Sequence, residues 1–319
     1  MDVVETRLGC RALLDAARAT GRTVGLVPTM GALHEGHVSL VTRARAECDL
    51  VAVSIFVNPL QFGDPEDIAH YPRTLERDLA ECAQAGVDVV FVPSVAEMYP
   101  SWPEPPATTV SVVGVSESWE GASRPGHFDG VATVVTKLFA IAGPCRAYFG
   151  LKDFQQLAVV RRMAADLSSP IDVVGCPIVR EGDGLALSSR NVRLSVLERA
   201  AATVLFRALA AGRDAIANGE RSAAALHAVM AQVVASEPLV RLDYAAAVDA
   251  ASLREHETVV DPAATRLLIA AGVGPVRLID NSAALVSAHA AETPYTTALT
   301  SAVPHPRGVV PQRQLERIG

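Results

Sequence analysis

The segment spanning residues 23–47 constrains the fold of this chain more than any other. Residues 23–27 form an apolar run typical of a buried strand, and residues 37–47 carry the amphipathic pattern of a helix. Only a short turn containing Gly31 and Gly36 separates the two. A strand followed closely by a helix is the repeating unit of α/β proteins, so the segment predicts a sheet of that class.

The same alternation continues along the first half of the chain. Residues 50–57 are apolar apart from Ser54, as expected of a parallel strand covered on both faces, and residues 87–92 resemble them, with Asp88 as the one polar residue. A helix that ends at Gly86 separates these two runs. Further strands are predicted at 145–149 and 171–176. The sequence therefore predicts an α/β fold built on a Rossmann-like doubly wound parallel sheet.

We expect three successive parts of the chain, at residues 1–178, 179–281 and 282–319. The first is the Rossmann-like domain, and the second is a smaller C-terminal α+β domain that carries a Ser-Ser-Arg loop. The third is rich in Ala, Ser, Thr and Pro, which predicts a low-complexity, disordered tail. Within the first part we expect a short strand at 108–113 and a flexible polar loop at 119–130.

Composition excludes several classes of protein. Half of the 319 residues are hydrophobic, which supplies ample core material. The formal net charge of −7 and the lack of a long basic run argue against a nucleic-acid surface. The charged first twenty residues predict neither a signal peptide nor a membrane span. Five scattered cysteines without CxxC spacing are typical of a reduced, cytoplasmic protein.

The turn between residues 27 and 37 is the first candidate site. Backbone N–H groups at a helix start bind anions, and Gly36 lets a ligand approach the backbone closely. His34 and His37 lie at this start, three residues apart. Two alternatives stay open: ordinary surface histidines, or a zinc pair that recruits a third ligand such as His127. We favour phosphate over zinc, because nothing in the local sequence points to that third ligand.

Other polar segments follow predicted strands at the end where α/β sheets bind ligands. Asn58 and Gln61 follow the strand at 50–57. Lys152 and Asp153 follow the strand at 145–149, where they could meet a phosphate and a ribose hydroxyl. Gln155 and Gln156 come next, and we expect one of them to point toward the sheet.

Two further segments carry groups that bind anions. Ser188, Ser189 and Arg190 offer two hydroxyls and a guanidinium to a polyphosphate, within a segment that could also be an interdomain linker. Arg124 lies in the polar loop at 119–130, which could cover the site and present a guanidinium fork to an anion.

Six segments together resemble the pantothenate synthetase family, in its order and spacing, and the similarity extends to about Asn281. The segments are 28–37 (PTMGALHEGH), 58–62 (NPLQF), 71–73 (YPR), 124–130 (RPGHFDG), 149–156 (FGLKDFQQ) and 179–191 (VREGDGLALSSRN). The His-x-Gly-His part alone would indicate only the wider nucleotidyltransferase superfamily. Leu151 and Leu187 depart from the family, which often has Glu and Met at these positions.

The resemblance implies ATP-dependent condensation of (R)-pantoate with β-alanine through a pantoyl-adenylate, giving pantothenate, AMP and pyrophosphate. The residues implied to act in catalysis are His34, His37 (as proton donor), Lys152 and Arg190. The residues implied to bind ATP are Thr29, Met30, Gly31, His34, His37, Gly150, Lys152, Asp153, Val179, Leu187, Ser188, Ser189 and Arg190. The residues implied to bind the acid substrate are Asn58, Gln61, Tyr71, Arg124 and Gln156.

This chemistry needs a cationic site, because a carboxylate must approach a triphosphate. We expect the two imidazoles, Lys152 and Arg190 to supply that field. The resemblance further implies Mg²⁺, with Asp78 as the candidate protein ligand, a cytoplasmic location and a homodimer.

Two rival functions remain open on the sequence. The first is a His-x-Gly-His adenylyltransferase acting on a phosphate ester, which would need an additional cationic pocket where this chain offers Gln61 and Gln156. The second is a nucleotide-binding protein without catalytic activity, against which the intact His37, Lys152 and Arg190 argue.

Overall fold

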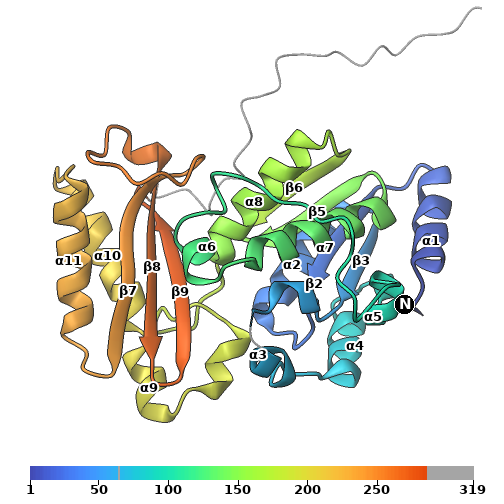
Figure 1. Cartoon of the computed structure of the whole chain (residues 1–319), viewed down its shortest axis with the longest axis horizontal. Coiled ribbons are helices and arrows are strands. Elements are labelled where there is room, and N and C mark those ends of the chain that lie inside the picture. The colour runs from blue at the N-terminus through green and yellow to red at the C-terminus, as the bar shows by residue number, and fades with distance from the viewer. Residues whose placement is uncertain (64, 286–319) are drawn as a thin grey trace, which may run out of the picture.

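The computed structural model describes residues 1–63 and 65–285, which form two lobes (Figure 1). The larger lobe holds a six-stranded sheet with helices on both faces, and the smaller lobe holds a three-stranded sheet. The predicted fold, a Rossmann-like parallel sheet followed by a smaller α+β domain, is confirmed. Within the described residues, no helix combines the length and the apolar character needed to cross a membrane.

All strand pairs of the larger sheet are parallel, in the order β1-β4-β3-β2-β5-β6. Its strands are β1 (Asp2–Val4), β2 (Val24–Thr29), β3 (Leu50–Ile55), β4 (Val89–Phe91), β5 (Cys145–Gly150) and β6 (Ile171–Cys176). β3 and β4 are buried along their whole length, as their continuous apolar sequences predict. The sequence analysis missed β1, because three residues are too few to show a periodicity.

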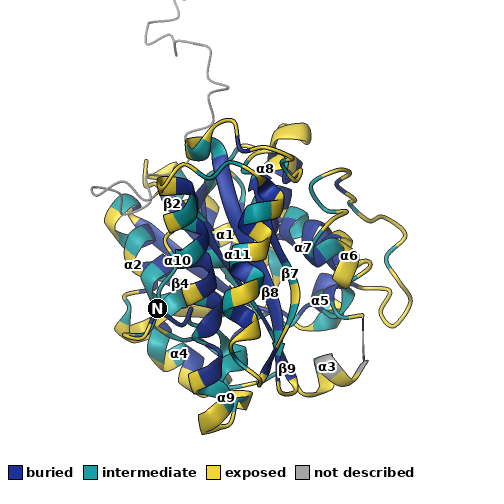
Figure 2. Cartoon of the chain, turned by 90° about the vertical axis from the view of Figure 1, so that its left-hand side faces the viewer, coloured by how far each residue is buried: buried dark blue, intermediate teal, exposed yellow. Residues whose placement is uncertain are grey.

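Helices cover both faces of this sheet, and each face has its own core. α1, α7 and α8 pack on one face, and α2 and α4 pack on the other. Figure 2 shows buried strands between helices whose outer sides are exposed. The helices of this lobe are α1 (Arg7–Ala19), α2 (Glu35–Glu47), α3 (Pro65–Ala69), α4 (Leu75–Gln84), α5 (Val95–Met98), α6 (Glu120–Ser123), α7 (His127–Ala142) and α8 (Phe154–Asp166).

Two neighbouring strands of this sheet, β2 and β5, define where a ligand can bind. β2 leads through α2 to β3 on one side, and β5 leads through the 3₁₀ turn η2 (Leu151–Asp153) and α8 to β6 on the other. The chain therefore leaves two neighbouring strand ends in opposite directions. Such a point opens a crevice at the carboxyl edge of the sheet.

The smaller lobe is an antiparallel sheet backed by helices. Its strands are β7 (Val240–Asp249), β8 (Thr265–Val273) and β9 (Val276–Ala283), and its helices are α9 (Val196–Ala201), α10 (Val204–Ala217) and α11 (Ala223–Ala235). One face of the sheet packs on α10 and α11 in a separate core. The other face packs on the larger lobe, where Leu268 of β8 shares a cluster with Phe154 and Trp119.

The segment at 119–130 differs from the flexible loop predicted for it. It contains α6 and the first turn of α7. The Trp119 indole N–H donates to Leu253 O at 2.9 Å, and the Glu120 carboxylate accepts two hydrogen bonds from Arg277, each at 2.7 Å. These contacts hold the segment against the smaller lobe.

Two other predictions also differ from the structure, a strand and the end of a domain. Residues 108–113 form no strand: all but Ser111 are β-branched, but the Val110 N–H donates to the Thr133 hydroxyl. β9 continues past the predicted domain end at Asn281, since Ser282 and Ala283 pair with β8. The rest of the predicted tail, from residue 286 onward, lies outside the described residues.

Candidate active site

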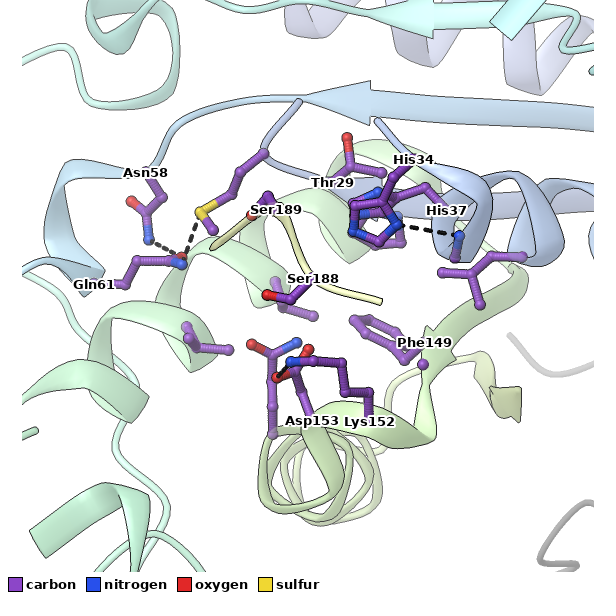
Figure 3. Close-up of a pocket in the computed structure, with 18 of the residues that line it drawn as sticks. Thr29, His34, His37, Asn58, Gln61, Phe149, Lys152, Asp153, Ser188 and Ser189 are labelled. Atoms are coloured by element: carbon purple, nitrogen blue, oxygen red, sulfur yellow. Dashed lines mark hydrogen bonds and ion pairs between the residues drawn. The ribbon is translucent and has the colours of Figure 1, made fainter. Parts of the chain in front are cut away.

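A cleft opens at the carboxyl ends of β2 and β5 and brings together nearly all of the predicted site residues. The predicted residues that line it are Thr29, Met30, His34, His37, Asn58, Gln61, Tyr71, Arg124, Gly150, Lys152, Asp153, Gln156, Val179, Leu187, Ser188, Ser189 and Arg190. Figure 3 shows Lys152 and Asp153 facing His34 and His37 across the cleft, with Ser188 between them.

The two histidines lie together at the start of α2. His34 is the N-cap residue, and its Nδ1 accepts the Gly36 N–H at 3.1 Å, which places the ring proton on Nε2. The two ring centroids are 4.1 Å apart. His37 Nδ1 is buried and has no hydrogen-bond partner among the described residues. A buried polar atom without a partner is costly.

The protein keeps both imidazoles neutral, contrary to the cationic role expected for them. Burial lowers the pKa of His37 to about 3, and the neighbouring His34 acts in the same direction. Burial, followed by the charge of Lys152, also lowers the pKa of His34. At pH 7 the fixed positive charges of the cleft therefore come from Lys152, Arg124 and Arg190.

Arg190 reaches the cleft on a loop that is tied down at both sides. Ser188 caps the 3₁₀ turn η3 (Ser189–Arg193) by accepting the Arg190 N–H at 3.3 Å. Before the turn, the Leu187 N–H donates to Val179 O at 3.0 Å. The two hydroxyls and the guanidinium are thus presented by a fixed backbone.

On the other side of the cleft, a chain of hydrogen bonds orients the amide of Gln61. Tyr99 O–H donates to Asn58 Oδ1 at 2.8 Å, and Asn58 Nδ2 donates to Gln61 Oε1 at 3.1 Å and to Gly130 O at 3.0 Å. The Gln61 oxygen is thus occupied, and its NH₂ group faces the cleft beside Met30 Sδ. Asn58 is 1% exposed, so it acts by holding Gln61.

A second pair of side chains holds Arg124 beside Gln61. His127 Nδ1 donates to Gln61 O at 2.9 Å, so its Nε2 is the acceptor for Arg124 Nη1 at 3.1 Å. Burial, followed by the Arg124 charge, lowers the pKa of His127 to about 4. A neutral His127 is what this arrangement requires. The sequence analysis weighed His127 only as a zinc ligand.

The two adjacent glutamines divide their roles, as expected of neighbours on a helix. Gln156 lines the cleft. Gln155 is 5% exposed and points away from it: its amide donates to Val115 O and Ser118 O, and its oxygen accepts the Glu120 N–H. Gln155 therefore anchors the segment that contacts the smaller lobe.

Gly31 and Asp78 are the two predicted site residues that do not line the cleft. The Asp78 carboxylate is 1% exposed and accepts the N–H groups of Ala32 at 2.9 Å and Leu33 at 2.8 Å. Gly31 lies against it with φ +82°, and an added Cβ would lie 2.9 Å from Asp78 Oδ2. The structure contradicts the assignment of Asp78 as a metal ligand, because its oxygens stabilise the turn backbone.

The sequence analysis missed an apolar wall of the cleft. Val131, Val134 and Val135 of α7 line it, although their sequence reads only as a buried helix. α7 also touches the backbone of the Gln61 segment: a Cβ added at Gly130 would lie 2.3 Å from Leu60 O. Only glycine fits at this contact.

Together, the doubly wound sheet and the cleft at its switch point define an α/β enzyme of the nucleotide-binding class. The sequence profile of the pantoate-beta-alanine ligase family matches residues 2–283, and the chain belongs to that family.

Individual relatives agree with this assignment. Pantothenate synthetase of Roseiflexus sp. (strain RS-1) is 56% identical over 269 residues, covering 84% of this chain and 95% of the relative. The enzyme of Moorella thermoacetica is 51% identical over 281 residues, covering 88% and 98%.

Solved structures agree as well. Pantothenate synthetase from Thermus thermophilus matches with a TM-score of 0.83 at 49% identity, covering 89% of this chain and 99% of that one. Pantoate-beta-alanine ligase from Francisella tularensis, complexed with beta-gamma ATP and beta-alanine, matches with a TM-score of 0.73 at 32% identity, covering 89% and 98%.

The buried histidines make stability depend on pH. An unfolded histidine titrates near pH 6.5, whereas folding lowers the pKa of His37 to about 3. Between these values the unfolded chain binds more protons, so stability is complete above about pH 6.5 and falls as the pH falls. We expect His37→Gln to reduce this slope by up to about 1.4 kcal/mol per pH unit, measured by urea unfolding between pH 7 and pH 4. His70→Gln, at an exposed histidine, is the control, and equal slopes in both variants would contradict the assignment.

Proposed function

We propose that this chain condenses pantoate with β-alanine at the expense of ATP, through a pantoyl-adenylate. A carboxylate oxygen of pantoate attacks the α-phosphorus, and pyrophosphate leaves. The β-alanine amine then attacks the acyl carbon, loses a proton, and AMP leaves with the carboxylate oxygen. The observation that supports this most is the meeting of His37, Lys152 and the Ser188–Arg190 turn in one cleft.

The adenylate route also follows from what the cleft lacks. Within the described lining there is no cysteine, and its two serines are engaged, Ser188 with the Arg190 N–H and Ser189 with Tyr71. An acyl-enzyme needs a nucleophile activated by a neighbouring base. We therefore place the activation of pantoate on ATP.

Each wall of the cleft suits one part of the substrates. Lys152, Arg190 and the start of α2 would bind the triphosphate and stabilise the charge that develops on it. The Gln61 NH₂ group would donate to an oxygen of pantoate, and the valines of α7 would contact its two methyl groups. Arg124, held by His127, would attract the carboxylate.

The residues of the cleft do not form a magnesium site of their own. In the described part of the chain, no three histidine, cysteine or acidic side chains are grouped to hold a metal. Asp153 is the only acidic residue of the described lining, and Lys152 pairs with it at 3.4 Å. We propose that Mg²⁺ arrives bound to the ATP phosphates.

We also propose that the enzyme works as a homodimer in the cytoplasm. The dimer rests on the family resemblance alone. The location is supported by the five cysteines, all of which are free.

Isotope transfer tests the adenylate directly. With both carboxylate oxygens of pantoate labelled with oxygen-18, one label should appear in AMP and one should stay in the amide of pantothenate. Mass spectrometry of AMP after complete turnover gives the result. AMP without heavy oxygen would overturn the route, and AMP release that needs no pantoate would overturn the choice of acid.

Arg190 and Arg193 form a matched pair for testing the phosphate contact. Both lie on η3, but Arg190 lines the cleft and Arg193 is exposed. We expect Arg190→Gln to slow pyrophosphate–ATP exchange by about 10²–10³-fold, the usual cost of one preorganised charge. Arg193→Gln should exchange like the unaltered enzyme. Equal rates in the two variants would remove Arg190 from the site.

The hydrogen-bond chain to Gln61 predicts a specific effect of Tyr99→Phe. Losing the hydroxyl leaves Asn58 Oδ1 with only the weaker Leu60 N–H at 3.3 Å, so the Gln61 amide is less firmly oriented. We expect the KM for pantoate to rise by about 2- to 10-fold, with the KM for ATP unchanged.

Tyr148→Phe is the control, because this tyrosine is equally buried but bonds to Glu47 and Cys48. A rise in the pantoate KM in both variants would indicate a general loss of packing.

A further inference from the structure

One side chain of the smaller lobe reaches the backbone on both sides of Lys152. Asn281 lies on β9, is 2% exposed, and donates from Nδ2 to Leu151 O at 2.9 Å and to Lys152 O at 2.8 Å. These two carbonyls belong to the peptide planes that flank the Lys152 Cα. A residue has only two soft backbone torsions, so holding both planes fixes where the Lys152 side chain leaves the chain.

A buried arginine fixes Asn281 in turn. Arg266 of β8 is 6% exposed, and its Nε donates to Asn281 Oδ1 at 2.7 Å. This bond settles which end of the amide faces the Lys152 turn. The same guanidinium lies 4.5 Å from the centre of the Phe154 ring. β8 and β9 therefore contact the turn at both ends, at residues 151–152 and at residue 154.

We propose that Asn281 is a positioning residue for the ATP step: it holds Lys152 in the geometry that the proposed function requires. Asn281 acts through the turn, because its Nδ2 donates to two turn carbonyls and its Oδ1 accepts from Arg266. Displacing a reacting group by about 1 Å can cost about 10²-fold in rate. The smaller lobe thus contributes to phosphate chemistry from a residue outside the Ser-Ser-Arg loop.

The test uses Asn281→Asp, which keeps the acceptor for Arg266 but replaces the donating nitrogen by an oxygen that repels both carbonyls. We expect pyrophosphate–ATP exchange to slow by about 10²-fold, with weaker ATP binding and an unchanged KM for pantoate. Asn281→Leu removes the two donors without adding charge, and we expect it to slow the exchange as Asn281→Asp does. It replaces Asn281→Asp in the test if the aspartate variant does not fold.

A second measurement does not depend on activity. The chain contains only two lysines, Lys137 and Lys152, so amine-selective labelling followed by mass spectrometry reports Lys152 with Lys137 as internal standard. The Lys152 side chain is 18% exposed. We expect its labelling relative to Lys137 to rise several-fold in both Asn281 variants. Unchanged relative labelling would overturn the proposal.

Arg277→Met separates positioning from simple contact between the lobes. Arg277 lies four residues earlier on β9, on the same face, and bonds to Glu120 of α6 and not to the Lys152 turn. This variant should lose stability but keep the labelling of Lys152 and the ATP step. Equal effects in the Arg277 and Asn281 variants would overturn the proposal. If the unaltered enzyme releases no AMP from pantoate, β-alanine and ATP together, the proposed function is wrong, while the labelling result stays valid.

Discussion

The adjacency of β2 and β5 is the constraint on which the rest of the molecule depends. Because the two strands run parallel and their chains leave in opposite directions, no connection crosses the crevice between their ends. The start of α2 with its histidines lies at one strand end, and the Lys152 turn lies at the other. Neither segment has to be folded around a ligand, since each is the continuation of a buried strand.

The elements that a short sequence window can reveal were predicted well. The apolar runs of β2 and β3 and the motifs at their ends led to the sheet and to most of the cleft. Gln156 and Gln155 show the limit of this approach. Both belong to the same motif, and a helix must send neighbours in different directions, but only the packing decides which of them meets the ligand.

Long-range contacts account for the predictions that were wrong. Asp78 is acidic, which made it a candidate metal ligand. Its carboxylate instead accepts the N–H groups of Ala32 and Leu33, which lie 46 and 45 positions away along the chain. The polar segment at 119–130 is held by Arg277, which lies 157 positions from Glu120. No local pattern carries information about partners at such distances.

The cleft contains two kinds of polar group, one charged and one neutral. Its positive charge is carried by lysine and arginine. Its imidazoles are kept neutral by burial, and hydrogen bonds fix the role of their nitrogens. His34 Nδ1 accepts from Gly36, and His127 Nδ1 donates to Gln61 O. A field of this kind does not have to reorganise when charge moves during a reaction, which is the property that enzymes exploit.

The contact between Gly130 and Leu60 also limits how this enzyme can change its acid substrate. The Gln61 segment and α7 touch backbone to backbone, with no room for a methyl group between them, so the segment cannot retreat to admit a longer acid. On the helix side, space can be gained by shortening side chains at Val131, Val134 or Val135. If the proposed function holds, acyl selectivity can change through substitutions on this helical face while the Gln61 amide stays in place.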